Sequence, residues 1–310
     1  MLVVAVSSRA LFNLEDGNRI YETDGPAAFD AYMRKHENKP LRRGVAFALV
    51  RKLLALNTPG QRDKVEVMLL SSNTLDAGAR VMNSVRHFGL GIERAFFTSG
   101  GDRFRIAKAG NVTLFLSTNP GEVKKALACG IASASVLPNS RVQRHRADSS
   151  SLCIAFDGDS VLFDDSAERV NQLEGLAAFQ ASEQSKAKVP LGDGPFKPVL
   201  QALHEIQEGF AAARTPGEER PLRIALVTAR GVPAYERVLR TFRTWGVRVD
   251  ESLFCGGLPK GPFLDALDAD LFFDDGMHNV ESARQYVPAG HVPHGIQGAK
   301  DGAAEAAEAA

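Results

Sequence analysis

Two aspartates follow a short apolar run in the middle of the chain, where they could act as a nucleophile and a proton carrier. Residues 153–163 read Cys-Ile-Ala-Phe-Asp-Gly-Asp-Ser-Val-Leu-Phe, so Asp157 and Asp159 flank one glycine. Such a run is typical of a strand buried on both faces of a parallel sheet, and ligands bind at the carboxyl ends of such strands. Like charges this close raise each other's pKa unless they share a cation. The pattern indicates a Mg²⁺ site with Asp157 as ligand and nucleophile and Asp159 as proton donor and acceptor. An Asp-Gly hairpin returning through residues 161–163 is an equal alternative.

Later segments favour the metal site. A second apolar run ends in the hydroxyl of Thr228, a glycine-rich turn delivers Lys260, and a third apolar run ends in the adjacent carboxylates Asp274 and Asp275. Each feature alone has an ordinary explanation, since a threonine can cap a helix and a lysine is usually solvated. In this order, at strand ends and in loops, they resemble the four motifs of the haloacid dehalogenase superfamily of phosphatases.

The resemblance implies metal-binding, nucleophilic and acid–base roles for these residues. The metal set is expected to comprise Asp157, Asp159, Asp274 and Asp275, with the direct ligand of the last pair left open. Mg²⁺ with Lys260 alongside would neutralise the nucleophile and the phosphoryl oxygens, and the Thr228 hydroxyl would hold the transferring group in line. Asp157 would form an aspartyl phosphate, while Asp159 would protonate the leaving alkoxide and then deprotonate water.

The chain looks more narrowly like the cytosolic type I 5'-nucleotidases and their bacterial relatives. Residues 4–12, 69–73 and 156–163 carry this resemblance, which extends over nearly the whole chain except its C-terminal end. It implies Mg²⁺-dependent hydrolysis of nucleoside 5'-monophosphates, AMP-like or pyrimidine and deoxy forms, to nucleoside and phosphate. The base and sugar preference does not carry over. A phosphatase for another small ester, such as a sugar phosphate, is the alternative enzyme. A non-catalytic nucleotide-binding regulator is disfavoured because it needs no Asp157–Asp159 pair.

Several residues are expected to bind the substrate: Thr228, Ala229, Arg230, Lys260 and Arg9. Arg230 lies two positions past Thr228 and could reach the phosphate or the ribose; a place at the start of a surface helix is equally compatible. Arg9 lies just past the first apolar run and could face the active site, although an internal ion pair explains it slightly better.

Composition excludes several other functional classes. The chain has 310 residues, 44% of them hydrophobic and 24% charged, which is ordinary for a soluble globular protein. The 37 basic and 37 acidic residues balance, which argues against a broad nucleic-acid-binding face. The opening residues are too few and lack the basic flank for a signal or a membrane span. Three widely spaced cysteines read as reduced core thiols: Cys129, Cys153 and Cys255. A cytoplasmic location without nucleic-acid or membrane partners is expected, and a homo-oligomer remains open.

An internal duplication is indicated by two similar segments. Residues 65–118 can be laid on residues 222–275 without a gap at a shift of 157 (228 − 71 = 157), which puts Ser71 on Thr228. Arginines, glycines and apolar residues also coincide, whereas chance similarity of two α/β segments is the alternative. A shift of 150 aligns the strands that open each half.

The first half lacks the carboxylates of the second in this alignment. Hydroxyls and a cation take their places: Ser7, Arg9, Ser117 and Thr118. Arg103 falls on Lys260, and Ser71 retains a hydroxyl. The first half is therefore expected to bind no metal but to keep groups suited to a phosphate anion. Its role could be a scaffold, a lid, a dimer surface or a second nucleotide site, the first two being favoured.

The expected fold is α/β, with two doubly wound, Rossmann-like units related by duplication. Residues 1–140 would form a degenerate domain and 150–296 a haloacid-dehalogenase-type catalytic domain with a small helical cap insertion at about 164–221. Residues 138–150 would link them, and 297–310 would be a flexible tail. Four stretches read as helices: 77–88, 169–182, 198–213 and 234–245. The first and last of these are followed by the cap signals Gly89 and Gly246.

Overall fold

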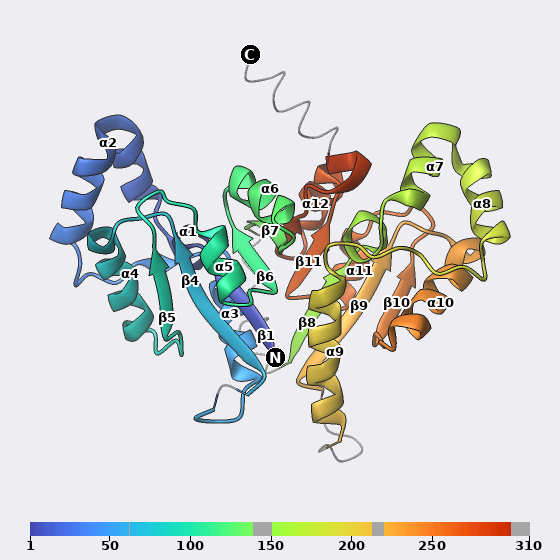
Figure 1. Ribbon diagram of the computed structural model, residues 1–310, viewed down its shortest axis with the longest axis horizontal. Coiled ribbons are helices and arrows are strands. Elements are labelled where there is room, and N and C mark those ends of the chain that lie inside the picture. Colours follow the sequence, from blue (N-terminus) through green and yellow to red (C-terminus); the bar gives the residue numbers. More distant parts are fainter. Residues whose placement is uncertain (62, 139–150, 213–219, 299–310) are drawn as a thin grey trace. The chain divides into compact units, whose positions relative to one another are not determined.

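The computed structural model describes residues 1–61, 63–138, 151–212 and 220–298. The chain divides into two compact units, unit 1 (Met1–Asn119) and unit 2 (Pro120–Ala310), which are described separately (Figure 1). The predicted domain bounds, 1–140 and 150–296, place the division later and remain a prediction. Most of the expected linker and of the expected tail lie outside the described residues.

Unit 1 is an α/β unit whose four sheet strands are all parallel, in the order β5-β4-β1-β6. The strands are β1 (Leu2–Val6), β4 (Val65–Ser71), β5 (Arg94–Phe97) and β6 (Leu114–Ser117). The helices are α1 (Ser8–Leu11), α2 (Glu15–Lys35), α3 (Phe47–Ala55), α4 (Leu75–His87) and α5 (Phe104–Ala109). A separate antiparallel pair joins β2 (Phe12–Asn13) to β3 (Arg42–Arg43).

Unit 2 has the strand order β10-β9-β8-β11-β12-β7, parallel except for the antiparallel pair β12–β7. Its strands are β7 (Ala132–Leu137), β8 (Leu152–Phe156), β9 (Leu222–Thr228), β10 (Glu251–Phe254), β11 (Leu271–Asp274) and β12 (Ala289–His291). Its α-helices are α6 (Pro120–Ala128), α7 (Ser166–Glu174), α8 (Leu176–Ser185), α9 (Lys197–Ala211), α10 (Tyr235–Trp245), α11 (Gly261–Ala266) and α12 (Met277–Ala283). The expected α/β class with a mostly parallel sheet is confirmed.

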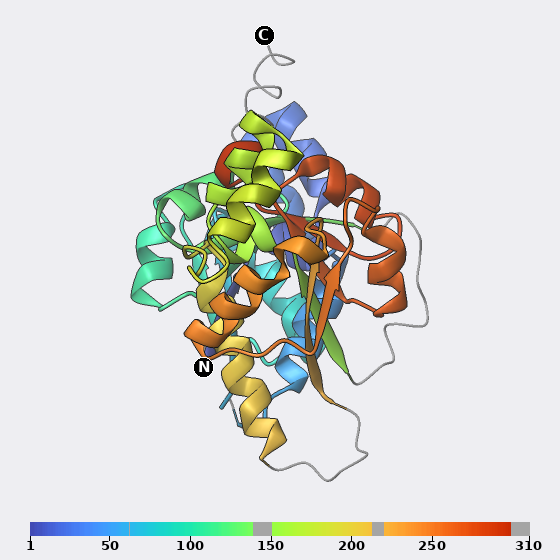
Figure 2. The same cartoon turned by 90° about the vertical axis from the view of Figure 1, so that its right-hand side faces the viewer.

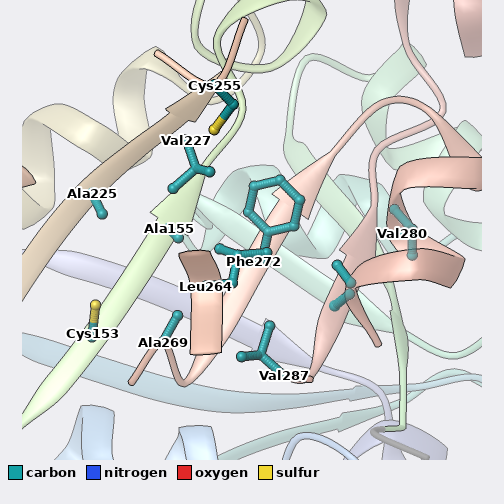
Figure 3. Close-up of a cluster of buried hydrophobic side chains, with 12 residues drawn as sticks. Cys153, Ala155, Ala225, Val227, Cys255, Leu264, Ala269, Phe272, Val280 and Val287 are labelled. Carbon is teal, nitrogen blue, oxygen red and sulfur yellow. The ribbon is translucent and has the colours of Figure 1, made fainter. Parts of the chain in front are cut away.

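The central strands of unit 2 are apolar on both faces because helices cover both. One face carries a cluster of small and medium side chains that packs against α11 and α12, with Phe272 at its centre (Figure 3). On the other face, the rings of Phe156 and Phe273 stack at 5.5 Å, and Phe196, just before α9, contacts both. Successive residues of a strand point to opposite faces, so a continuous apolar run satisfies both layers.

Helix boundaries agree with the sequence pattern in three of the four stretches. The glycines after α4 and α10, Gly89 and Gly246, have φ values of 62° and 67°, which suits a left-handed cap. The prediction of one helix over residues 169–182 is wrong. The chain forms α7 and α8 instead, separated at Gly175, whose φ of 86° and ψ of 173° cannot continue a helix. Both views show α7 and α8 side by side at one end of unit 2 (Figure 2).

Two further sequence expectations can be compared with the structure. All three cysteines are free thiols; Cys153 and Cys255 are buried and Cys129 is partly so. Among the described residues, no helix combines the length and the apolar character needed to cross a bilayer.

Candidate active site

The chain order of unit 2 reverses between β8 and β11, which lie side by side in the sheet. Both strands run in the same direction, and Phe156 is paired in register with Phe273. The backbone N–H of Asp157 donates to the Phe273 carbonyl at 2.8 Å, so Asp157 lies directly beside Asp274. A reversal of this kind opens a crevice at the carboxyl ends of the strands. Two predicted metal ligands therefore meet at the point where an α/β sheet binds ligands.

The turn after β8 is closed like a wide helical turn. Residues Gly158–Leu162 form a π-type turn in which the Phe163 N–H donates to the Gly158 carbonyl at 2.9 Å. Ser160 within it has a φ of 62°, and the Asp157 carboxylate accepts from the Gly158 N–H at 2.7 Å. The alternative prediction of a hairpin through residues 161–163 is wrong, because these residues build this turn and form no return strand. Wide turns of this type are often found at functional sites.

Three carboxylates and one ammonium meet at the strand ends. Oxygens of Asp157, Asp274 and Asp275 lie within 4.8 Å of one another. The Nζ of Lys260 lies 2.9 Å from Oδ2 of Asp157 and 2.6 Å from Oδ2 of Asp274. All four side chains are buried. One lysine cannot balance three buried carboxylates, so the cluster favours one or more added positive charges.

The pKa values of the cluster reflect this imbalance. Burial, together with Asp274, raises the pKa of Asp157 to about 7 despite the opposing effect of Lys260. Burial, reinforced by Asp274, also raises the pKa of Asp275 well above its usual value. Burial alone would lower the pKa of Lys260, but the carboxylates of Asp157 and Asp274 raise it above its ordinary value. A hard divalent cation takes oxygen ligands of this kind and would stabilise the ionised carboxylates, so the cluster fits Mg²⁺.

Neighbouring groups fix the orientation of Asp274. Its Oδ1 accepts from the Gly276 N–H at 2.9 Å and from the Asn279 side-chain amide at 3.0 Å, while its Oδ2 contacts Lys260. Asn279 lies in the first turn of α12, immediately after the paired aspartates. Sequence analysis missed it, although a polar residue within one turn of two paired aspartates is a recognisable signal. Such outer contacts orient a ligand carboxylate.

Asp159 lies apart from the three-carboxylate cluster in this structure. Arg230 holds both oxygens of its carboxylate, with Nε 2.8 Å from Oδ2 and Nη2 2.7 Å from Oδ1. The Nη1 of Arg230 contacts Glu183 on α8, and Arg237 on α10 contacts the second oxygen of Glu183 at 2.7 Å. Sequence analysis did not predict this buried chain of four charges, because no local pattern marks Glu183 as a buried carboxylate. The assignments of Asp159 as a metal ligand and of Arg230 as a substrate contact remain predictions.

The remaining predicted residues line two adjoining hollows. A cleft of about 420 Å³ is bordered by Asp157, Asp159, Thr228, Ala229 and Lys260, among others. A smaller hollow of about 90 Å³ shares Asp159 and Ala229 with it and also includes Arg230. The structure thus brings every predicted site residue of unit 2 except Asp274 and Arg230 to the wall of the larger cleft, and Asp274 lies immediately beneath it.

Arg9 belongs to unit 1, in α1. Its guanidinium lies 3.2 Å from the carboxylate of Glu15, and its side chain is 40% exposed. This agrees with the ion pair that sequence analysis favoured. Its assignment as a substrate contact is untested and remains a prediction.

Comparison with known proteins agrees with the motifs. A family model for 5'-nucleotidases matches residues 1–299. The human protein cytosolic 5'-nucleotidase 1B is 36% identical over 294 residues, which cover 92% of this chain and 47% of that protein. The chain thus spans about half the length of this curated relative. No solved structure matches this chain. Because the family model covers nearly every residue and the identity extends over the same range, this chain belongs to the cytosolic type I 5'-nucleotidase family.

Proposed function

We propose that the protein is a Mg²⁺-dependent phosphoric monoester hydrolase that converts nucleoside 5'-monophosphates to nucleoside and phosphate. One observation carries the proposal: three buried carboxylates and Lys260 converge at the strand ends beneath a cleft bordered by Thr228. A purely structural ion cluster would need balanced charges, whereas this one has an excess of negative charge facing a cleft. The family membership supplies the substrate class.

The first chemical step uses Asp157 and Asp159. An Asp157 oxygen attacks phosphorus, the bond from phosphorus to the ribose 5'-oxygen breaks, and an aspartyl phosphate forms. For this step Asp159 releases one of its contacts to Arg230, takes up a proton from solvent and gives it to the departing 5'-oxygen, which leaves as the nucleoside hydroxyl. Asp159 borders the same cleft as Asp157. Its position on the wide turn separates its carboxylate from the cluster that contains the nucleophile.

The second step returns the enzyme to its starting state. A water attacks the phosphorus of the aspartyl phosphate, Asp159 accepts a proton from that water, and the bond to Asp157 breaks to release phosphate. Lys260 and the Thr228 hydroxyl hold the phosphoryl oxygens in line during both steps. When bound, Mg²⁺ would neutralise phosphoryl charge that otherwise repels the nucleophile, with Asp157, Asp274 and Asp275 as the residues that hold it.

The size and lining of the site suit a nucleotide. A cleft of about 420 Å³ lies within the range of small-molecule sites. Glu168 and Asn171 of α7 line both hollows, and Phe179 of α8 lines the smaller one. We therefore propose that α7 and α8, within the predicted insertion at about 164–221, act as the small cap that covers the nucleoside.

We also propose that the two units arose by duplication, and matched hydrogen bonds support this. In unit 1, Arg80 Nε donates to the Lys39 carbonyl at 3.0 Å; in unit 2, Arg237 Nε donates to the Val189 carbonyl at 2.9 Å. The alignment by sequence pairs the two arginines at a shift of 157 (237 − 80 = 157). Two unrelated α/β units would have no reason to share a helix-to-loop contact of this kind.

A second matched contact and a shared break in helix geometry point the same way. The Leu41 N–H donates to Ser84 Oγ at 3.0 Å in unit 1, and the Leu191 N–H donates to Thr241 Oγ1 at 2.9 Å in unit 2. Non-helical glycines interrupt the helices in both units: Gly25 with φ 84° and ψ 179°, and Gly175 with φ 86° and ψ 173°. The two glycines are 150 residues apart (175 − 25 = 150), which is the shift that aligns the strands opening each half.

The units differ at the turn that carries Asp159. Phe12 pairs with Arg43 in unit 1, and Phe163 pairs with Asp193 in unit 2. The second residues of these pairs are separated by 150 (193 − 43 = 150), but the phenylalanines are separated by 151 (163 − 12 = 151). The turn of unit 2 therefore has one extra residue, and it is the wide turn. We propose that this added residue accompanied the placement of Asp159 at the cleft.

A cytoplasmic location completes the proposal. The relative is named as a cytosolic enzyme, and free thiols agree with a reducing compartment. A nucleoside monophosphate is the proposed partner, without nucleic acid or membrane.

Phosphate release from a panel of nucleoside monophosphates and sugar phosphates, with Mg²⁺ present, tests the proposed activity. Nucleoside 5'-monophosphates are expected to give the highest kcat/KM, and the Asp157→Asn variant is expected to release no phosphate under the same conditions. Preferential turnover of a sugar phosphate would overturn the substrate class but leave the phosphatase chemistry standing. Failure of every ester would overturn both.

A further inference from the structure

The strand ends of unit 1 preserve the backbone of the proposed catalytic site without its carboxylates. The Ser7 N–H donates to the Leu116 carbonyl at 2.9 Å, as the Asp157 N–H does to the Phe273 carbonyl at 2.8 Å. Ser7 therefore stands beside β6 as Asp157 stands beside β11. The chain order of unit 1 also reverses at this place, between β1 and β6.

The hydroxyls at these strand ends repeat the local contacts of their counterparts. Ser71 Oγ accepts from the Asn73 N–H at 3.2 Å, as Thr228 Oγ1 accepts from the Arg230 N–H at 3.2 Å. Ser117 Oγ accepts from the Asn119 N–H at 3.1 Å, in the place where Asp274 accepts from Gly276. A hydroxyl group can accept from a backbone N–H and donate its own proton at the same time.

The loop that carries the cation is also preserved. The Gly100 N–H donates to the Ser72 carbonyl at 2.9 Å, and the Gly257 N–H donates to the Ala229 carbonyl at 3.1 Å. These two glycines have nearly equal φ values, 83° and 85°. Each loop then leads to a buried cationic residue before a short helix, Arg103 in unit 1 and Lys260 in unit 2.

Two hydroxyls beside these groups lack partners. Within the described part of the chain, Ser8 Oγ and Thr118 Oγ1 are buried and have no hydrogen-bond partner. Ser8 is only 3% exposed and follows Ser7 directly, while Thr118 follows Ser117 at the next strand end. A buried hydroxyl without a partner lowers stability, so these two hydroxyls favour a ligand with acceptor oxygens in this part of unit 1.

We propose that the ends of β1, β4 and β6 form a metal-independent site for a phosphate group. Its ligand is inorganic phosphate or the phosphate of a nucleotide. The hydroxyls of Ser7 and Ser71 donate to the phosphate oxygens, and Arg103 supplies the charge. Serines stand at these strand ends in place of the carboxylates of unit 2, so the ligand is held without being cleaved.

An arginine suits this task better than the lysine of the other unit. Lys260 is a compact charge placed between two carboxylates, whereas a guanidinium presents a planar fork that matches two phosphate oxygens. Arg103 also lies against the ring of Phe104, with 5.5 Å from its guanidinium carbon to the ring centroid, which restricts its orientation. The inference rests on the proposed duplication and not on the nucleotidase activity.

The test is calorimetric titration of the full-length protein with inorganic phosphate and, separately, with AMP in excess chelator. Chelator removes metal from unit 2, so binding is measured without hydrolysis. Wild type and the matched control Lys260→Ala are expected to bind phosphate, and Arg103→Ala is expected to bind it at least about tenfold more weakly. If phosphate binds and AMP does not, the site is a product site. If AMP binds more tightly than phosphate, it is a nucleotide site.

A second variant keeps the test decisive if Arg103→Ala does not fold. Ser7→Asp places a carboxylate where unit 2 already carries one, so the backbone accepts it, and its negative charge should abolish phosphate binding. Failure of wild type to bind millimolar phosphate in chelator would overturn the site. So would equal phosphate affinity in folded wild type and Ser7→Asp, or loss of binding in Lys260→Ala alone. A failed nucleotidase assay would leave these measurements unaffected.

Discussion

Arg230 holds both oxygens of the Asp159 carboxylate, at 2.8 Å from Nε and 2.7 Å from Nη2. The third nitrogen of the same guanidinium contacts Glu183 on α8. Although burial alone would lower it, these carboxylates raise the pKa of Arg230 above its ordinary value, so the guanidinium stays charged. Arg230 therefore links the proposed acid–base residue to a helix of the proposed cap.

The first prediction concerns this link. Arg230→Ala should lower kcat by about tenfold or more, because Asp159 loses the group that orients it. It should also lower the free energy of unfolding by about 3 kcal/mol, since two buried carboxylates lose their shared cation. Steady-state kinetics and urea unfolding measure the two effects.

Arg237→Ala is the matched control, since it removes the other partner of Glu183 and leaves the Arg230–Asp159 pair intact. It should lose stability and keep kcat within about threefold of wild type. Equal losses of kcat in the two variants would show that Arg230 acts only through folding.

The second prediction is that Asp157→Asn abolishes turnover and leaves the protein folded. Asp159, the next carboxylate along the chain, is held by Arg230 and cannot replace the nucleophile, so kcat should fall by at least about a thousandfold. Removing one of three crowded buried carboxylates should leave the metal-free melting temperature unchanged or higher. Phosphate release and thermal unfolding check both statements; turnover within about tenfold of wild type would contradict the assigned nucleophile.

The third prediction concerns the metal. Activity should vanish in excess chelator and return with Mg²⁺, and Mg²⁺ should raise the melting temperature because it binds only the folded state. Asp274→Asn and Asp275→Asn should reduce that rise, whereas Asp193→Asn, at a side chain 60% exposed, should not. Full activity in chelator, or an equal rise in all variants, would refute the proposed ligand set.

The strand ends were predictable because a parallel strand covered on both faces must be apolar along its length. Asp157 and Asp274 interrupt such runs where the strands end, and β8 and β11 are neighbours in the sheet. Their convergence followed from the order of motifs along the chain. Lys260 and Thr228 followed from the same reasoning, although the catalytic roles of all four remain predictions.

Other features depend on tertiary contacts that no local pattern encodes. Glu183 is buried only because Arg230 and Arg237 reach it from outside its own helix, so its sequence neighbourhood resembles that of any solvated glutamate. The wide turn after β8 is closed by a hydrogen bond from the Phe163 N–H to the Gly158 carbonyl, which composition does not specify. The break at Gly175 was visible as a glycine, yet a glycine within a helix is often tolerated.

The last prediction separates the contribution of unit 1 from that of β7. The pairing of β7 with β12 joins Ala289 to Leu137 and His291 to Ser135, and His291 Nε2 lies 3.1 Å from the Asp275 carbonyl. A fragment of residues 146–310 lacks β7, so it exposes β12 as a sheet edge close to the proposed metal site. A fragment of residues 120–310 retains β7.

We expect 146–310 to be aggregation-prone or poorly active and 120–310 to be markedly more soluble, as judged by gel filtration and phosphate release. Full wild-type kinetics from 120–310 would show that unit 1 contributes nothing to catalysis. Full kinetics from 146–310 would contradict the role given to β7 as well. A soluble 120–310 fragment with intact Mg²⁺ stabilisation is the expected result, because the proposed metal ligands and Lys260 all lie in unit 2 and β7 keeps β12 paired.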